Sequence, residues 1–237
     1  MKKPYLFHPK KRILLITGHY GSGKTEFAVN LARMLHHTME CPFPRVAIVD
    51  IDVVNPYFRS RELNDLLAQE GIPVYGNACE GDVTAEIPAL SAAVRTPLED
   101  PGCCTILDVG GNDAGARILK QFRKYFVTDE CLLLAVINRN RPETRTEDGA
   151  VSHLHAIENE LGLKVQGLIN NTHLLRETSA DDIRKGRALC EAVSKETGTP
   201  ILCDTYPAPL LDASELDDLP GPLFPVQLCM RPEWLDK

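Results

Sequence analysis

Features that would place this chain of 237 residues in a membrane or secreted class are missing. No apolar run approaches the roughly 18 residues of a membrane span, and the longest, from Cys131 to Ile137, is typical of a buried strand. The first apolar stretch is too short for a secretory signal peptide and runs directly into a glycine-rich loop. We therefore expect a cytoplasmic protein that does not bind a membrane.

A surplus of positive charge is also missing. The chain has 26 Lys and Arg against 33 Asp and Glu, which gives a net charge of −7. Sequence-independent DNA binding needs basic residues to neutralise the phosphates, so no nucleic-acid partner is expected.

The eight cysteines include no CxxC pair and no Cys/His spacing typical of a metal site. A chain of this length does not need disulfides for stability. We expect most of the cysteines to be free, packed thiols, with metal binding as the alternative.

The remaining sequence alternates short apolar runs with helical patterns. The strand candidates are residues 13–17, 46–50, 73–75, 105–108, 132–137, 165–169 and 201–203. The helix candidates are residues 24–36, 59–70, 114–125, 147–161 and 181–197. This alternation predicts an α/β fold with three layers, in which helices cover a doubly wound, mainly parallel sheet of about seven strands. We expect a single domain over residues 1–237, with a core at 13–207 and an irregular Pro-rich acidic tail at 208–237.

The strongest motif is the loop between the first strand and helix candidates. Residues 18–25 read GHYGSGKT, which fits the phosphate-binding pattern G-x-x-x-x-G-K-[ST]. Glycines let backbone N–H groups face phosphate oxygens, and the next helix presents its positive end to the same anion. Lys24 would reach the β- and γ-phosphates in catalysis, and the Thr25 hydroxyl would bind Mg²⁺. The candidate nucleotide-binding residues are Gly18, Tyr20, Gly21, Ser22, Gly23, Lys24, Thr25 and Glu26. An incidental glycine-rich turn is the alternative.

Asp108 ends a strand candidate and is followed by Val-Gly-Gly. A carboxylate at the end of a buried strand is costly unless it is paired or faces a metal-bound water. This is the Walker B role in P-loop proteins, and Gly110 and Gly111 would then form a switch segment that senses the γ-phosphate. Helix capping by Asp108 is the alternative.

Asp50 and Asp52 end the second strand candidate. Strand alternation places both carboxylates on one side of the chain, where they could face Mg²⁺ or an attacking water. Capping of the next helix is the alternative. Arg59 and Arg61 follow, and each would either hold a phosphate or pair with a nearby acid.

Asn170 closes a late strand candidate, in the string Ile-Asn-Asn-Thr-His. Its amide offers both a donor and an acceptor, which suits an adenine edge, although Asn is also common in turns. The guanine-specificity string N-K-x-D is absent here, so adenine is favoured.

Together these strings resemble the MinD/ParA/CobQ–CobB superfamily of SIMIBI-type P-loop proteins over roughly residues 13–207. The longer strings GHYGSGKTE, DIDVVNPYFRSRE, DVGGNDAGA and INNTHL resemble, more narrowly, an uncharacterised bacterial group labelled as nucleotide-binding proteins. The superfamily resemblance implies a parallel sheet, ATP with Mg²⁺ and, often, a nucleotide-sandwich homodimer.

On the same resemblance, Asp52 would orient the attacking water, Asp108 would stand at the metal and Asn170 would contact adenine. Pro207 would lie near the point where these proteins close over the base. One departure is His19, since MinD and ParA carry a signature Lys at that position. The trans-acting Lys is therefore in doubt here, and Arg59 or Arg61 is a candidate for the missing charge.

Three functions fit these observations. The first is a slow, Mg²⁺-dependent ATPase that acts as a nucleotide switch for a protein partner, with the segments around Asp52 and Gly110 as switches. The second is an ATP-dependent ligase of the dethiobiotin-synthetase or cobyrinate-amidase type, for which Arg59, Arg61, Arg139 and Arg141 are candidate substrate contacts. The third is a nucleotide-binding module without turnover.

Overall fold

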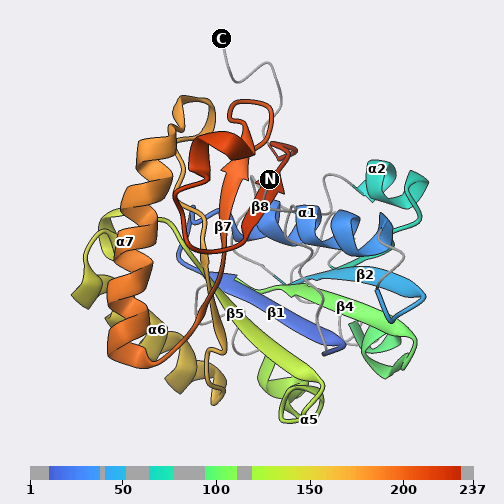
Figure 1. The fold of residues 1–237 in the computed structure, drawn as a ribbon. Helices are drawn as coiled ribbons and strands as arrows, with labels where there is room; N and C mark the ends of the chain where they lie inside the picture. The colour runs from blue at the N-terminus through green and yellow to red at the C-terminus, as the bar shows by residue number, and fades with distance from the viewer. Residues whose placement is uncertain (1–10, 38–40, 52–63, 77–93, 111–118, 231–237) are drawn as a thin grey trace, which may run out of the picture.

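The computed structural model describes residues 11–37, 41–51, 64–76, 94–110 and 119–230. Its centre is one sheet of eight strands, all paired in parallel, in the order β3-β2-β4-β1-β5-β6-β7-β8 (Figure 1). The strands are β1 (Ile13–Gly18), β2 (Arg45–Asp50), β3 (Val74–Gly76), β4 (Cys103–Asp108), β5 (Cys131–Ile137), β6 (Gly167–Asn170), β7 (Ile201–Pro207) and β8 (Leu223–Val226). The predicted α/β fold is confirmed, with one strand more than expected.

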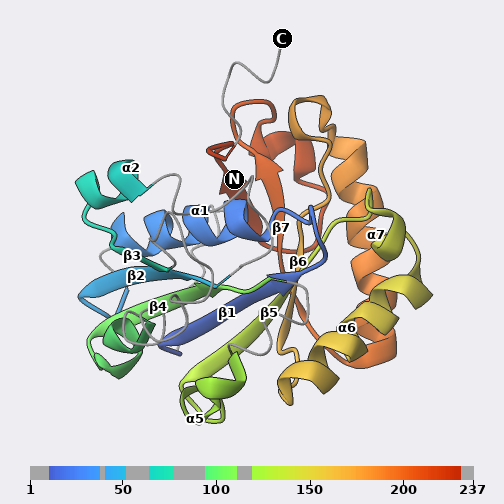
Figure 2. The same ribbon diagram turned by 180° about the vertical axis from the view of Figure 1, so that it is seen from behind.

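Helices cover both faces of this sheet (Figures 1 and 2). The helices are α1 (Lys24–His37), α2 (Asn64–Gln69), α5 (Arg123–Phe126), α6 (Glu147–Leu161) and α7 (Ala180–Thr197). On one face, Phe27 of α1 belongs to the same buried cluster as Leu14 and Ile16 of β1. On the other face, Leu154 of α6 belongs to the cluster that contains Leu15. Neighbouring residues of β1 thus serve different cores, because successive strand side chains point to opposite faces.

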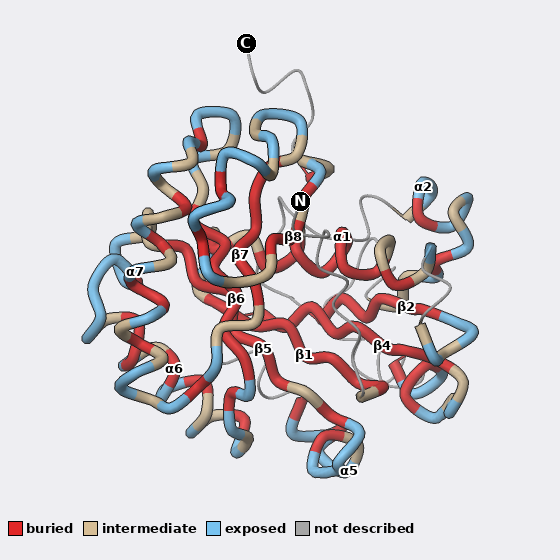
Figure 3. Tube along the Cα trace, viewed as in Figure 1, coloured by how far each residue is buried: buried red, intermediate tan, exposed pale blue. Residues whose placement is uncertain are grey.

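The strands are buried over most of their length, as Figure 3 shows. A strand covered by helices on both faces needs a nearly continuous apolar run, which is the pattern that the sequence displays. The polar side chains that function requires are therefore confined to the strand ends and the loops that follow them.

The two long helices of the C-terminal half begin and end at residues suited to those places. The Thr146 hydroxyl accepts a hydrogen bond from the Gly149 N–H before α6, and Ser179 and Asp182 form a capping box before α7. Both helices end at a glycine in the left-handed region, Gly162 with φ of 63° and Gly198 with φ of 73°.

Most predicted elements lie within a few residues of the observed ones. The helix predicted over 147–161 is α6, whereas β7 continues to Pro207 instead of ending at residue 203. The helices predicted over 59–70 and 114–125 fall partly outside the described residues, which contain their later parts as α2 and α5.

The prediction of an irregular tail over 208–237 was wrong at residues 213–216 and 223–226. The 3₁₀ turn η4 (Ala213–Leu216) lies in it, and β8 pairs in parallel with β7, Asp204 opposite Leu223. Leu216 and Leu223 pack with Ile183 and Tyr206 in a third apolar cluster. The many Pro and acidic residues of this segment argue against a strand. An edge strand nevertheless accepts a proline such as Pro225, because the backbone on its outer side has no partner strand in the described sheet and needs no N–H donor.

Within the described ranges, no helix combines the length and the apolar character needed to cross a membrane.

Candidate functional site

The loop between β1 and α1 has the backbone that its glycines allow. Gly21 and Gly23 have φ of 71° and 83°, in the left-handed region that other residues avoid. A Cβ on Gly23 would also lie 2.3 Å from Nδ2 of Asn171 and 3.0 Å from Nε2 of His173. Glycine is therefore required at this position both for its backbone conformation and for the close approach of the loop after β6.

Thr25 and Asp108 meet beneath this loop. The Thr25 hydroxyl donates to Oδ2 of Asp108 at 2.5 Å, and both side chains are buried. Asp50 lies at the end of β2, opposite Asp108 in the ladder between β2 and β4. The structure thus brings together the three residues predicted to bind Mg²⁺, and a hydroxyl beside carboxylates is the donor set that this ion prefers.

No group of three or more His, Cys, Asp or Glu in the described part of the chain forms a metal site. The seven cysteines that it contains are all free, as predicted, and burial raises the pKa of Cys131 to about 12. The Cys131 thiol is therefore protonated at neutral pH.

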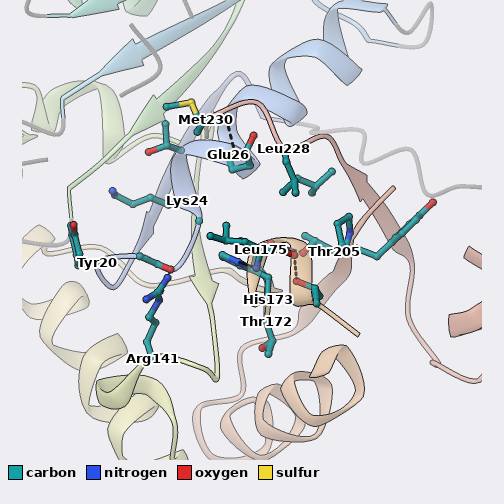
Figure 4. A pocket seen from close by; sticks show the side chains of 18 residues that line it. Tyr20, Lys24, Glu26, Arg141, Thr172, His173, Leu175, Thr205, Leu228 and Met230 are labelled. Carbon is teal, nitrogen blue, oxygen red and sulfur yellow. Dashed lines mark hydrogen bonds between the residues drawn. The ribbon is translucent and has the colours of Figure 1, made fainter. Parts of the chain in front are cut away.

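A cavity of about 270 Å³ opens at the phosphate loop and extends along the ends of β6, β7 and β8 (Figure 4). Its phosphate-loop end is lined by Tyr20, Gly21, Gly23, Lys24, Thr25, Glu26 and Arg141. The side away from this loop is mostly apolar, with Tyr206, Pro207, Val226 and Leu228, while Leu175 and Met230 add apolar groups to the wall and Met230 lies beside Glu26. Asn171, Thr172, His173, Thr178 and Thr205 contribute polar groups to the wall. A chamber with one cationic and one apolar end suits a ligand with a phosphate chain and a flat ring system.

Asn171 connects the phosphate loop to β7. Its Nδ2 donates to the backbone oxygen of Ser22 at 2.7 Å, and its Oδ1 accepts from the Thr205 hydroxyl at 2.5 Å. Asn171 and Thr205 are both buried, so each hydrogen bond is protected from water. This bridge fixes the position of the phosphate loop relative to the far wall of the cavity.

His173 carries no charge at neutral pH. Burial, together with the positive charge of Arg141, lowers its pKa to about 4, while a hydrogen bond to the Ser22 backbone acts in the opposite direction. Arg141 itself donates from Nε to the backbone oxygen of Gly21 at 2.7 Å. The phosphate-loop end of the cavity thus has Lys24 and Arg141 as its cations.

The segment after β8 is anchored to α1. The Glu26 carboxylate accepts from the N–H of Cys229 at 2.6 Å and of Met230 at 3.1 Å, and Asn30 exchanges two hydrogen bonds with the Gln227 backbone. Burial raises the pKa of Glu26, although both N–H donors oppose that rise. These contacts place Leu228 and Met230 in the cavity wall.

Asn170 does not line the cavity, so the predicted contact with the adenine edge does not fit the structure. Its Nδ2 donates to the backbone oxygen of Ile183 and to Oδ1 of Asp204, and its Oδ1 accepts from the Thr172 N–H. The Asn170 side chain is completely buried, and it points toward α7. The next residue, Asn171, points the other way, toward the phosphate loop.

The other predicted residues divide into three groups. Pro207 lies in the cavity wall, and its place near the base stays a prediction. Gly110 follows β4 and is buried. Asp52, Arg59 and Gly111 fall outside the described residues, so their expected roles remain predictions.

Sequence reasoning gave no role to Asn171, Thr205 or the segment 226–230. Asn171 directly follows Asn170, the residue predicted to contact adenine. The sequence of a single chain carries no local signal that shows which of two neighbouring residues faces the cavity. The segment 226–230 joins the site through tertiary contacts alone, because it lies some 200 residues from Glu26.

Solved structures of the same fold include FtsY from Mycoplasma mycoides, with a TM-score of 0.55 at 15% identity over 82% of this chain and 59% of that one. Another is the cell division protein FtsY from Thermotoga maritima, with a TM-score of 0.52 at 21% identity over 84% and 64%. The signal recognition particle receptor FtsY from Elizabethkingia anophelis, in complex with GDP, gives 0.50 at 16% identity over 85% and 57%.

This chain therefore spans about three fifths of the length of those proteins. At these identities the likeness shows the fold, which is that of the P-loop NTPases. No protein-family model matches the chain, and no curated protein matches it. The narrower resemblance to the MinD/ParA/CobQ–CobB superfamily stays a prediction.

Proposed function

We propose that this protein binds ATP with Mg²⁺ and hydrolyses it slowly, as a nucleotide switch that acts on a protein partner. The observation that carries the proposal is the pair Thr25–Asp108 beside Lys24, at the cationic end of a cavity whose other end is apolar. Phosphates would lie at the loop and the base between β6 and β8, with Lys24 as a catalytic residue.

Thr25 and Asp108 would hold the magnesium ion, with Asp50 close to it. A bound magnesium ion neutralises phosphate charge and polarises the bond that breaks. The Thr25 hydroxyl already lies within hydrogen-bonding distance of Asp108, so little rearrangement is needed for both to face one cation. Asp52 would orient the attacking water.

Adenine suits the base end better than guanine. Guanine presents two adjacent N–H donors, which proteins commonly bind with a carboxylate. Among the described residues that line the cavity, Glu26 is the one carboxylate, and its oxygens accept from Cys229 and Met230. Because the acceptors of Glu26 are engaged, we propose ATP as the ligand, although one FtsY structure of this fold contains GDP.

The switch role is supported by the segments that follow the predicted metal-binding residues Asp50 and Asp108. Asp50 and Asp108 end β2 and β4, and the segments with Asp52, Arg59, Gly110 and Gly111 follow directly. A change at the γ-phosphate would therefore act first on these segments. A protein partner or a second copy of the chain would respond to that change.

Phosphate release with Mg²⁺-ATP and Mg²⁺-GTP tests this proposal. We expect slow release that is selective for ATP and falls roughly 100-fold in Lys24→Ala, the usual size for the loss of one transition-state charge donor. Lys164→Ala is the matched control, because Lys164 is an exposed lysine in the segment after α6 that pairs with Glu158 and does not line the cavity. Equal rates in Lys24→Ala and wild type, or a preference for GTP, would overturn the proposal. Turnover that requires a metabolite would support the ligase alternative instead.

A further inference from the structure

Arg141 lies at the phosphate end of the cavity on a firmly held piece of backbone. It precedes the 3₁₀ turn η2 (Pro142–Thr144). Its N–H donates to the Asn138 backbone oxygen, which also accepts from the Thr144 hydroxyl at 2.7 Å. Asn138 is completely buried and its Oδ1 accepts from the Asn140 N–H. The guanidinium therefore projects from a rigid loop after β5.

That guanidinium packs directly against the phosphate loop. Its Nε donates to the Gly21 backbone oxygen at 2.7 Å, and a Cβ on Gly21 would lie 2.7 Å from its Cζ and 2.9 Å from Nη2. Figure 4 shows Arg141 reaching the loop from the segment after β5, whereas Lys24 comes from the start of α1. The two cations thus approach the same end of the cavity from different elements.

Arg141 differs from the other described arginines whose guanidinium groups make hydrogen bonds, because it has no carboxylate partner among the residues that the structure describes. Those arginines each pair with a carboxylate: Arg12 with Glu130, Arg33 with Glu70, Arg45 with Asp100, Arg184 with Asp218 and Arg187 with Asp204. For Arg141, the described part of the chain offers no carboxylate partner, and one hydrogen bond uses only its Nε. The N–H groups on its two Nη atoms remain for a ligand.

The nearby imidazoles do not replace this charge. His173 is neutral at pH 7, since its pKa lies at about 4. The ring of His19 lies edge-on to that of His153 with centroids 5.3 Å apart, its Nδ1 is 3.5 Å from Glu143, and it does not line the cavity. Arg141 is thus the second cation, besides Lys24, among the described residues of the cavity wall.

We propose that Arg141 is a phosphate-binding residue of this site. Its Nε holds the phosphate loop at Gly21, and its Nη groups donate to phosphate oxygens of the bound nucleotide. The planar guanidinium can do both at once because its donors point in fixed, different directions. This inference rests on the proposed nucleotide binding, and the experiment separates the two.

The experiment measures the affinity of wild type, Arg141→Met and Arg141→Lys for adenosine, AMP, ADP and ATP by calorimetry. We expect Arg141→Met to weaken ATP binding about tenfold to a hundredfold, the range for a charge-assisted hydrogen bond. The loss should grow with the number of phosphates, leave adenosine unaffected and be partly restored in Arg141→Lys. Arg145→Met is the matched control, because Arg145 is an exposed arginine at the end of the same turn.

An equal loss for adenosine and ATP would overturn the inference and leave Arg141 as a brace of the loop. Unchanged affinities would overturn it as well. If wild type binds ATP and Lys24→Ala does not, the proposed nucleotide binding stands. Equal losses or unchanged affinities in Arg141→Met then refute only the phosphate contact of Arg141. If wild type binds none of the four ligands, the proposed function itself fails.

Discussion

The bridge formed by Asn171 permits a quantitative test of how the cavity is held together. In Asn171→Ala, the Thr205 hydroxyl loses its partner in a buried place, which costs about 1–3 kcal/mol. The Ser22 oxygen loses one hydrogen bond and keeps the one from His173, which adds roughly 1 kcal/mol. We therefore expect the free energy of unfolding to fall by about 2–4 kcal/mol.

Thr205→Val removes the same hydrogen bond from its other side and leaves Oδ1 of Asn171 unpaired, for about 1–3 kcal/mol. The double variant lacks both the Thr205 hydroxyl and the Asn171 amide, so no buried polar group of this pair is left without a partner. The two losses in stability should therefore not add. The double-mutant cycle should give a coupling of roughly 1–2 kcal/mol.

Urea denaturation followed by circular dichroism measures all three variants. Asn159→Ala, an exposed asparagine on α6, is the matched control and should change stability by less than about 0.5 kcal/mol. Additive losses in the cycle would refute the bridge between the phosphate loop and β7. Weaker ATP binding in Asn171→Ala is expected for the same reason, because the Ser22 backbone loses its brace.

Three further results are expected. Stability should decrease as the pH falls from 6.5 to about 4, because burial lowers the pKa of both His173 and His153 to about 4 and the unfolded chain binds these protons more readily; His173→Asn should reduce this dependence in urea titrations, and an unchanged slope would contradict the reasoning. Glu26→Ala should speed amide hydrogen exchange at residues 229–230 by roughly tenfold, since their acceptor is lost, and equal exchange would show that the segment is held otherwise. Gly186→Ala, normally stabilising in a helix, should here cost about 1–3 kcal/mol in thermal or urea unfolding, because its Cβ would lie 2.0 Å from the Thr172 hydroxyl; a more stable variant would contradict that packing.

The fold and the phosphate end of the site could be predicted from the sequence because their signals are local. Short apolar runs between helical patterns predicted the parallel sheet, and helix α6 was predicted to the residue. The string from Gly18 to Thr25 predicted a phosphate loop between a strand and a helix, which is where the structure has it. Thr25 and Asp108 were each predicted to lie at the magnesium ion, and the structure has their side chains in contact.

The far end of the site was decided by tertiary structure. Strand β8 is four residues long in a Pro-rich acidic segment, and it becomes a strand only because β7 offers a free edge and an apolar cluster lies beneath it. No local pattern shows that residues 226–230 close the cavity, because their anchor is Glu26, at the other end of the chain.

The asparagines at the end of β6 show the same limit most plainly. The sequence predicts that a polar pair follows a buried strand, but Asn170 and Asn171 point to opposite sides because side chains alternate. Which of them faces the phosphate loop depends on how β6 pairs between β5 and β7 and on the close packing of Gly186 in α7. Arg141 reaches Gly21 across 120 residues of sequence in the same way. Local patterns determined the elements and the phosphate loop, and the pairing of distant strands decided which side chains line the site.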